Sequence, residues 1–481
     1  MPDCPSTECE QAAHGKDKCP YLTAAYILAG LAMMLNIRLS YSSAPYALIR
    51  FKLPENLFSV FVRRMASALE LWCLPSMLLG NIMDIGVKAA YDGSGTNTPT
   101  TTDKQVRFGA IIVPSIITQW LNFVTYVILL VVYRRGGDQG RLTTFYWVIA
   151  ISGFVFGINM TLVYAADYNY VPVYIAGENS FPAITSFIHY LTTLMFGNRR
   201  KYNSDFIIVT VDIWVAIIIS FVAAVVWTVA YGYYAGSDIT TGDLKHIYAQ
   251  GFFASPEVDL VSPAMMVIVG MGLVYAIYPG IAPGMIVPFY LIDKIEMVLL
   301  IATIFPPVII AFLRRFKDQV GAIYSPTCKW GTDTLNTFTR KYKNSGDANN
   351  PVDAWHWHAF DLLIIIKISL SAIFIYSLHY KESNISRSIF NQPKMSTALS
   401  IVFYMCHEFL LAIGFAGVVG GNGGGDTVLI PQYIGALFMI FLAFYSEGYI
   451  IEYKSHDPAR WPTEECGIYM DTTNCTLIFL L

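Results

Sequence analysis

Long apolar runs recur along this chain at the length of a membrane-spanning helix. About 20 apolar residues in a helix cross the roughly 30 Å of hydrocarbon in a bilayer. About eleven runs meet this length, with approximate cores at 21–37, 65–87, 108–133, 144–166, 170–196, 206–235, 262–282, 285–313, 359–380, 396–420 and 429–452. We therefore predict an all-α polytopic membrane protein with about 11 transmembrane helices.

Composition and charge support this class and argue against others. Apolar residues make up 55% of the chain and charged residues 14%, which lies outside the range of soluble globular proteins. A net charge of −3 argues against a nucleic-acid partner, because such a partner requires a basic face. Residues 1–20 lack the basic and then apolar order of a signal peptide, so we expect the first helix to direct insertion.

Polar segments divide the predicted helices into groups. The longest segments follow the sixth and eighth helices, and residues 344–350 have the Ser, Gly, Asn and Asp content of a linker. We expect one bundle rather than separate domains. The expected order is a polar N-terminal tail (1–20), helices one to six (21–235), a central loop (236–261), helices seven and eight (262–313), a basic polar loop (314–357), helices nine to eleven (358–453) and a C-terminal tail (454–481).

The eight cysteines do not form the closely spaced pairs of a zinc or redox site. The spacing of Cys4, Cys9 and Cys19 is loose, and we interpret residues 1–20 as a flexible tail rather than a metal site. Cys466 and Cys475 are candidates for a disulfide if the C-terminus lies outside the cytosol. We predict no metal and no cofactor.

The sequence from Tyr278 to Leu300 places ionisable side chains inside an apolar run. A charge near the middle of a spanning helix costs roughly 2.5–3.5 kcal/mol on insertion scales, so it faces protein or a water-filled path rather than lipid. Three prolines precede these charges, and proline removes a backbone donor and breaks a helix. The prolines are Pro279, Pro283 and Pro288, and the charged residues are Asp293, Lys294 and Glu296. We predict a broken helix here that lines the functional path.

Further polar residues fall within other predicted helices. We expect Asp84 and Asp361 to meet water at helix ends. We expect five charged residues to lie deep in the membrane, namely Glu70, Asp293, Glu296, Lys367 and Glu408. Each of them has two alternative roles, as a member of a structural ion pair or as part of a substrate or proton path. Gly153 and Gly157 have the spacing of close helix packing.

Enzyme signatures are incomplete in this sequence. His407 and Glu408 begin the pattern of a zinc-protease helix, but Leu411 stands where the second histidine ligand is required. A phosphate-binding glycine loop and a serine-nucleophile elbow are both missing from the sequence. We predict that the protein is not an enzyme.

Three short motifs carry a resemblance to a known family. Gly30 is followed by an apolar run and Asn36 in the first helix; Tyr278-Pro-Gly-Ile281 lies in the seventh; and Phe289 precedes Asp293 by four residues in the eighth. These motifs resemble those of the equilibrative nucleoside transporter family in a divergent form, of the kind that protozoan parasites carry, or its Tpr-related multi-spanning branch. The resemblance implies a major-facilitator-like helical bundle.

This sequence departs from the family pattern at several of these positions. The family has Pro-Trp-Asn where this chain has Met34, Leu35 and Asn36. The eighth-helix motif has an arginine where Met297 stands, and in the family the aspartate and arginine contact sugar hydroxyls. We hypothesise that Lys367 supplies the missing cation. The substrate-binding residues implied or inferred are Asn36, Tyr290, Asp293, Glu296, Met297, Lys367 and Glu408.

The resemblance implies a facilitative carrier that moves nucleosides or similar polar small molecules by alternating access. The alternative is a non-transporting membrane protein whose buried charges serve helix packing. The expected partners are a small-molecule solute and the lipid bilayer. The family places the protein in the plasma membrane with its N-terminus in the cytoplasm and its C-terminus outside, whereas lysine and arginine counts over short loops favour the opposite orientation.

Overall fold

The computed structural model of the chain consists of helices and their connections. It describes residues 20–33, 39, 44–54, 57–91, 100–136, 141–198, 201–233, 247–249, 260–320, 324, 326, 330, 355–380, 382–422 and 425–455. Strands are absent from these ranges. Seven helices among the described residues are long and apolar enough to cross a membrane. The prediction of an all-α polytopic membrane protein is thereby confirmed.

The first block of helices covers residues 20–233. The eleven predicted apolar segments begin here, and each of the first six contains a helix. The elements are α2 (Pro20–Met33), α4 (Ala44–Arg50), α5 (Phe58–Ala89), α6 (Thr101–Arg107), the π-helix η2 (Phe108–Ile112), α7 (Val113–Arg135), α8 (Arg141–Ala166), the 3-10 helix η3 (Tyr168–Tyr170), α9 (Val171–Phe196), α10 (Ser204–Trp227) and the π-helix η4 (Thr228–Tyr233).

The second block covers residues 261–455. Its elements are α12 (Val261–Ile277), α13 (Phe289–Ala302), α14 (Phe305–Arg315), α15 (Lys317–Val320), the 3-10 helix η8 (Trp355–Asp361), α16 (Leu362–His379), α17 (Asn384–Asn391), α18 (Pro393–Asn422) and α19 (Gly425–Ser455). The seventh predicted segment ends early, at Ile277, and the eighth divides into α13 and α14. A count of eleven spans therefore stays a prediction.

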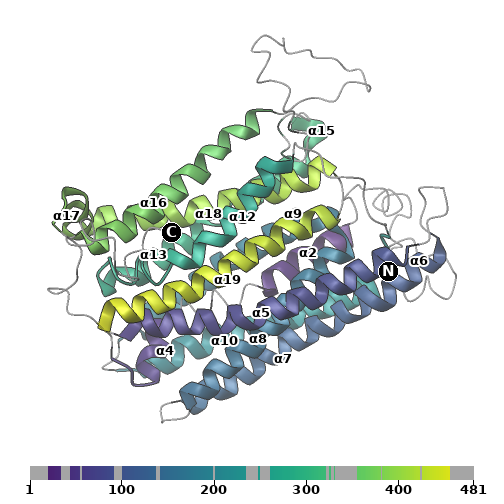
Figure 1. Cartoon of the computed structure of the whole chain (residues 1–481). Helices are drawn as coiled ribbons and strands as arrows, with labels where there is room; N and C mark the ends of the chain where they lie inside the picture. Colours follow the sequence, from purple (N-terminus) through teal and green to yellow (C-terminus); the bar gives the residue numbers. More distant parts are fainter. Residues whose placement is uncertain are drawn as a thin grey trace, which may run out of the picture.

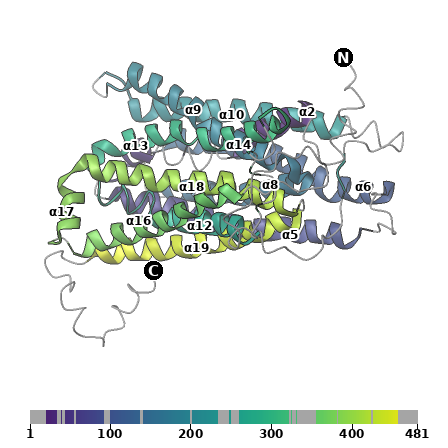
Figure 2. The same ribbon diagram turned by 90° about the horizontal axis from the view of Figure 1, so that it is seen from above.

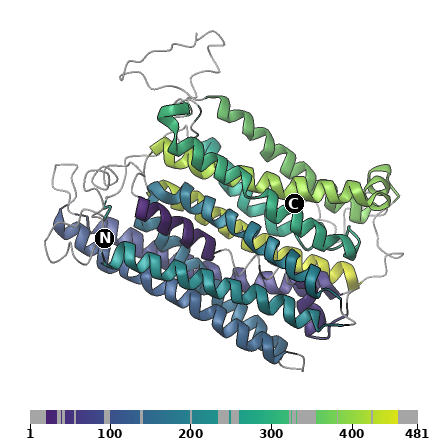
Figure 3. The same cartoon turned by 180° about the vertical axis from the view of Figure 1, so that it is seen from behind.

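The helices of each block pack mainly on one another. In the first block α5 packs on α8, α2 on α9 and α10, and α7 on α8 and α10, while in the second α12 packs on α18 and α19. The blocks meet where α5 contacts α19 and where α9 contacts α13 and α14. Figure 1 shows α5, α7 and α8 on one side, α16 and α18 on the other, and α9 and α19 between them. Figures 2 and 3 show the same long helices from above and from behind.

Glycines allow the closest helix approach in the first block. A Cβ atom on Gly153 would lie 2.2 Å from the backbone oxygen of Leu69, and one on Gly157 would lie 2.4 Å from that of Cys73. Any larger residue would push α8 away from α5. This confirms the predicted packing role of the two glycines.

Candidate functional site

The end of α12 is held by side chains from other helices. In an α-helix the carbonyl of residue 275 would accept a hydrogen bond from the N–H of residue 279, but Pro279 has none. Instead, Arg63 of α5 donates through Nη1 to the Tyr275 carbonyl, and Ser446 of α19 donates to the Ala276 carbonyl at 2.6 Å. The predicted helix break is present, and its free carbonyls are capped by α5 and α19.

Arg63 is also paired with an acid on its own helix. Its Nη2 lies 2.9 Å from Oε2 of Glu70, two turns further along α5, and the side chains are 0% and 2% exposed. The two buried charges stabilise each other, because an isolated ion in a low-dielectric interior is strongly disfavoured. Glu70, Arg63 and the Tyr275 carbonyl thus form a polar connection from the first block to the second.

The residue that opens the break makes a second polar contact. Tyr278 is 1% exposed and donates its hydroxyl proton to Oε1 of Glu296 in α13. Its ring packs against Tyr404 of α18, with centroids 4.7 Å apart. Glu296, which the sequence predicts as a site residue, therefore faces the break from the following helix.

Four other predicted site residues have no described side chains. Asn36 lies outside the described residues. Tyr290, Asp293 and Met297 belong to the helical backbone of α13, but their side chains also lie outside the described part. A role for these four residues in solute binding stays a prediction.

Lys367 of α16 and Glu408 of α18 belong to helices that pack on α12, and Lys367 contacts α12 before the helix break rather than at it. Lys367 is fully buried, donates to the Gly270 carbonyl at 2.7 Å and lies 5.1 Å from the centroid of Phe403. His407 Nδ1 donates to the same carbonyl at 2.8 Å, and the carboxylate of Glu408 acts electrostatically on Lys367. The structure brings Lys367 and His407 together at the Gly270 carbonyl, two turns before α12 ends, and Glu408 follows His407 in α18.

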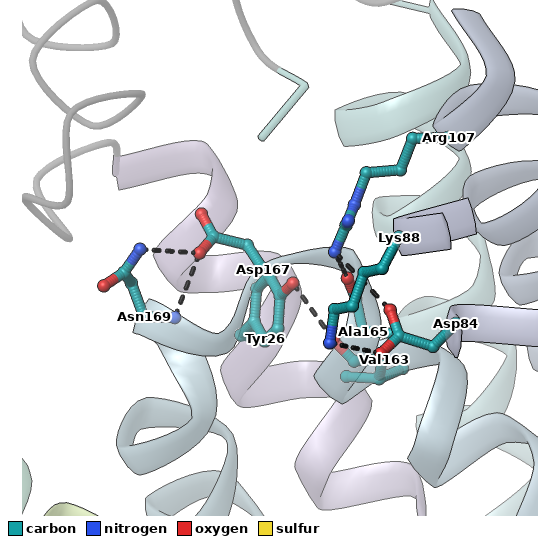
Figure 4. Close-up of polar contacts among 8 residues, drawn as sticks. All are labelled: Tyr26, Asp84, Lys88, Arg107, Val163, Ala165, Asp167 and Asn169. Carbon is teal, nitrogen blue, oxygen red and sulfur yellow. Dashed lines mark hydrogen bonds and ion pairs between the residues drawn. The ribbon is translucent and has the colours of Figure 1, made fainter. Parts of the chain in front are cut away.

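A separate charged cluster lies at the end of α5 (Figure 4). Lys88 Nζ lies 2.5 Å from Asp84, and Arg107 at the end of α6 lies 3.9 Å from Asp84. Arg107 also donates to the Ala165 carbonyl, while Tyr26 of α2 donates to the Val163 carbonyl at 3.2 Å. These are terminal carbonyls of α8, which lack intrahelical partners and attract donors and cations.

Asp167 follows α8 and caps the 3-10 helix η3. Its Oδ1 accepts from the backbone N–H and the side-chain amide of Asn169, each at 3.0 Å. Burial raises the pKa of Asp167 to about 6, against the opposing effects of these hydrogen bonds and of Arg107 and Arg314. The Asp167 carboxyl therefore titrates closer to neutral pH than an exposed aspartate.

One expectation from the sequence is wrong here, and one site residue was missed. Asp84 does not meet water, since it is 1% exposed and paired with Lys88. The residue that the sequence analysis missed is Arg63, which lies within α5 because this helix begins at Phe58, seven residues before the predicted core. The available signal was the Arg63 to Glu70 spacing of seven residues, which places opposite charges on one helix face.

The described residues fit an integral membrane protein with a polar interior. Among these residues, no group of three His, Cys, Asp or Glu side chains is arranged to hold a metal. Exposed apolar side chains on α7, such as Ile117 and Leu121, suit contact with lipid.

Comparisons with known proteins do not assign the chain to a family. No family model and no curated protein matches it. It is similar at 12% identity to a solved bacterial homologue of the iron transporter ferroportin, over 90% of this chain and 100% of that chain, with a TM-score of 0.38. It is also similar at 12% identity to a bacterial homologue of the human drug peptide transporters PepT1 and PepT2, over 90% and 97% of the chains, with a TM-score of 0.30.

Proposed function

We propose that this protein is a facilitative carrier of polar small molecules that works by alternating access between the first and second blocks. Such a carrier needs contacts between its blocks that form in one state and break in another. It also needs polar groups inside the bundle that a solute can reach. Both features belong to the buried interior rather than to the lipid-facing surface.

The contact from Arg63 to the Tyr275 carbonyl carries this proposal. It joins α5 of one block to the broken end of α12 in the other, and the arginine is fully buried. Movement of α12 would expose that carbonyl to solute or water, while Arg63 would keep Glu70 as its partner. Because Arg63 is also paired with Glu70, it can release the carbonyl of the second block without becoming an unpaired buried ion.

Nucleosides are the solutes that we propose for this carrier. Support comes from the resemblance of the first, seventh and eighth predicted helices to equilibrative nucleoside transporters, with Asp293 at the place of the sugar-binding aspartate. We also propose a plasma-membrane location with the N-terminus in the cytoplasm. Reaction of Cys466 and Cys475 with an impermeant thiol reagent only after permeabilisation, with reductant present, would contradict that orientation.

Uptake into proteoliposomes tests the carrier. We expect purified full-length protein to equilibrate labelled adenosine or uridine across the vesicle membrane without an ion gradient. Arg63→Gln and Asp293→Asn should each lower the initial rate about tenfold at equal incorporation, as expected for the loss of one charged contact. The matched control is Arg64→Gln, since Arg64 is the next residue and its side chain is 59% exposed.

The alternative, a non-transporting protein, is favoured by one observation. Lys367 and Arg63 contact helix carbonyls, which is how a charge that only packs helices would behave. In that case the wild-type vesicles equilibrate neither nucleoside, and the same substitutions change the unfolding temperature alone. Wild-type uptake with unchanged rates for Arg63→Gln and Asp293→Asn would keep the carrier but remove these residues from its mechanism.

A further inference from the structure

Helix α7 has one apolar face and one polar face, and the polar face points inward. Apolar residues of the outer face are strongly exposed, with Ile117 at 54% and Leu121 at 45%. The polar residues are buried at 5% exposure or less, and they are Ser115, Thr118, Gln119, Asn122 and Thr125. A spanning helix in this arrangement places hydrogen-bonding groups in the interior of the first block.

Most of these polar groups have a protein partner. Ser115 accepts from the indole N–H of Trp227 at 2.9 Å, and Thr118 reaches Asn159 of α8 at 3.1 Å. The side-chain amide of Asn122 donates to the Ala32 carbonyl of α2 at 3.1 Å. The face is therefore built against α2, α8 and α10.

Three atoms on this face have no hydrogen-bond partner in the described structure. They are Oε1 and Nε2 of Gln119 and Oδ1 of Asn122, and both residues are only 1% exposed. Residues three apart on a helix are neighbours, so the two amides lie side by side on one face. Buried amide atoms without partners are disfavoured unless water or a ligand meets them.

The two helices that carry and first contact these amides, α7 and α2, offer no counter-charge to an ionic ligand at that position. The described part of α2, Pro20–Met33, and the segment Val113–Tyr133 of α7 contain no charged residue. A side-chain carboxamide presents an acceptor beside a donor, so it pairs with a group that offers a donor beside an acceptor, as glutamine and asparagine do with adenine. An ion would gain no counter-charge from these two helices.

We infer that Gln119 and Asn122 form a subsite for an uncharged solute that presents an adjacent hydrogen-bond donor and acceptor, as the edge of a nucleobase does. The inference rests on the proposed carrier function and deepens it, since it names the groups that recognise the uncharged part of the solute. Gln119 offers both halves of the pair, and Asn122 offers a further acceptor one turn away.

Thermal unfolding of the detergent-purified full-length protein tests the subsite. Adenosine should raise the unfolding temperature of the wild type, whereas purine riboside, which lacks the exocyclic amine, should raise it less. Gln119→Leu should abolish the difference between the two nucleosides and raise the uptake KM for adenosine about tenfold. Without solute, the same variant should unfold at the same or a higher temperature, because it removes unpaired buried atoms.

Thr125→Val is the matched control, since Thr125 is buried on α7 but donates only to the backbone carbonyl of Asn122 at 2.7 Å. It should keep the wild-type discrimination. Wild-type discrimination in Gln119→Leu would overturn the subsite while the carrier stands if uptake is intact. A large loss of stability without solute would assign the amide to folding. Absence of both binding and uptake of adenosine and uridine in the wild type would overturn the subsite and the carrier together.

Discussion

Two of the buried charge clusters in the described part of the protein differ in what they connect. Asp84, Lys88 and Arg107 lie at helix ends within the first block, and Arg107 caps a carbonyl of α8 in that block. Arg63 lies inside α5 and reaches from its partner Glu70 to the broken end of α12 in the second block. The first cluster can hold one block together through any movement, whereas the second must change if the blocks move apart.

The largest expected effect separates these roles by removing Arg63. Arg63→Leu leaves Glu70 as a buried carboxylate without its cation, and we expect it to destabilise the protein by about 3–5 kcal/mol. Glu70→Leu in the same chain should restore most of that loss. A double-mutant cycle on unfolding in detergent measures the coupling. Additive effects of the two substitutions would show that Arg63 and Glu70 do not stabilise each other. The two clusters would then not differ in the way described above.

A smaller effect is expected from pH in the first block. The folded-state pKa of Asp167 is raised to about 6, above its ordinary value near 4. Between these values the folded state binds more protons than the unfolded state, so stability falls as pH rises from about 4 to 6 and is constant above that window. The loss is at most about 3 kcal/mol. Asp167→Asn should flatten this part of the stability profile, and an unchanged slope would contradict the assignment.

The smallest effect is expected at the neighbour of Arg63. Arg64 also points across the block boundary, where its Nε lies 3.5 Å from Glu447 of α19, but its side chain is 59% exposed. Solvent screens such a pair, so Arg64→Leu should change stability by about 0–1 kcal/mol. Unfolding under the conditions of the Arg63 cycle gives the measurement. A loss as large as that of Arg63→Leu would mean that burial does not distinguish the two arginines.

Much of the fold follows from the sequence because a spanning helix satisfies its own backbone hydrogen bonds. The length of each apolar run therefore predicts a helix without reference to its neighbours, and all eleven predicted segments contain one. Pro279 likewise predicts the end of α12, because its missing N–H is a local property. Gly153 and Gly157 predicted a close contact by their spacing alone.

The partners of the buried polar groups were decided by tertiary structure. The Lys367 ammonium donates to the Gly270 carbonyl, which no local pattern marks as an acceptor, while its expected contact with Asp293 stays a prediction because the Asp293 side chain lies outside the described residues. Arg63 became the cap of α12 only because the fold brings residues 212 positions apart into contact. Helix formation depends on residues within a few turns, whereas the choice of partner depends on which helices pack together, and side chains distant in sequence settle that choice.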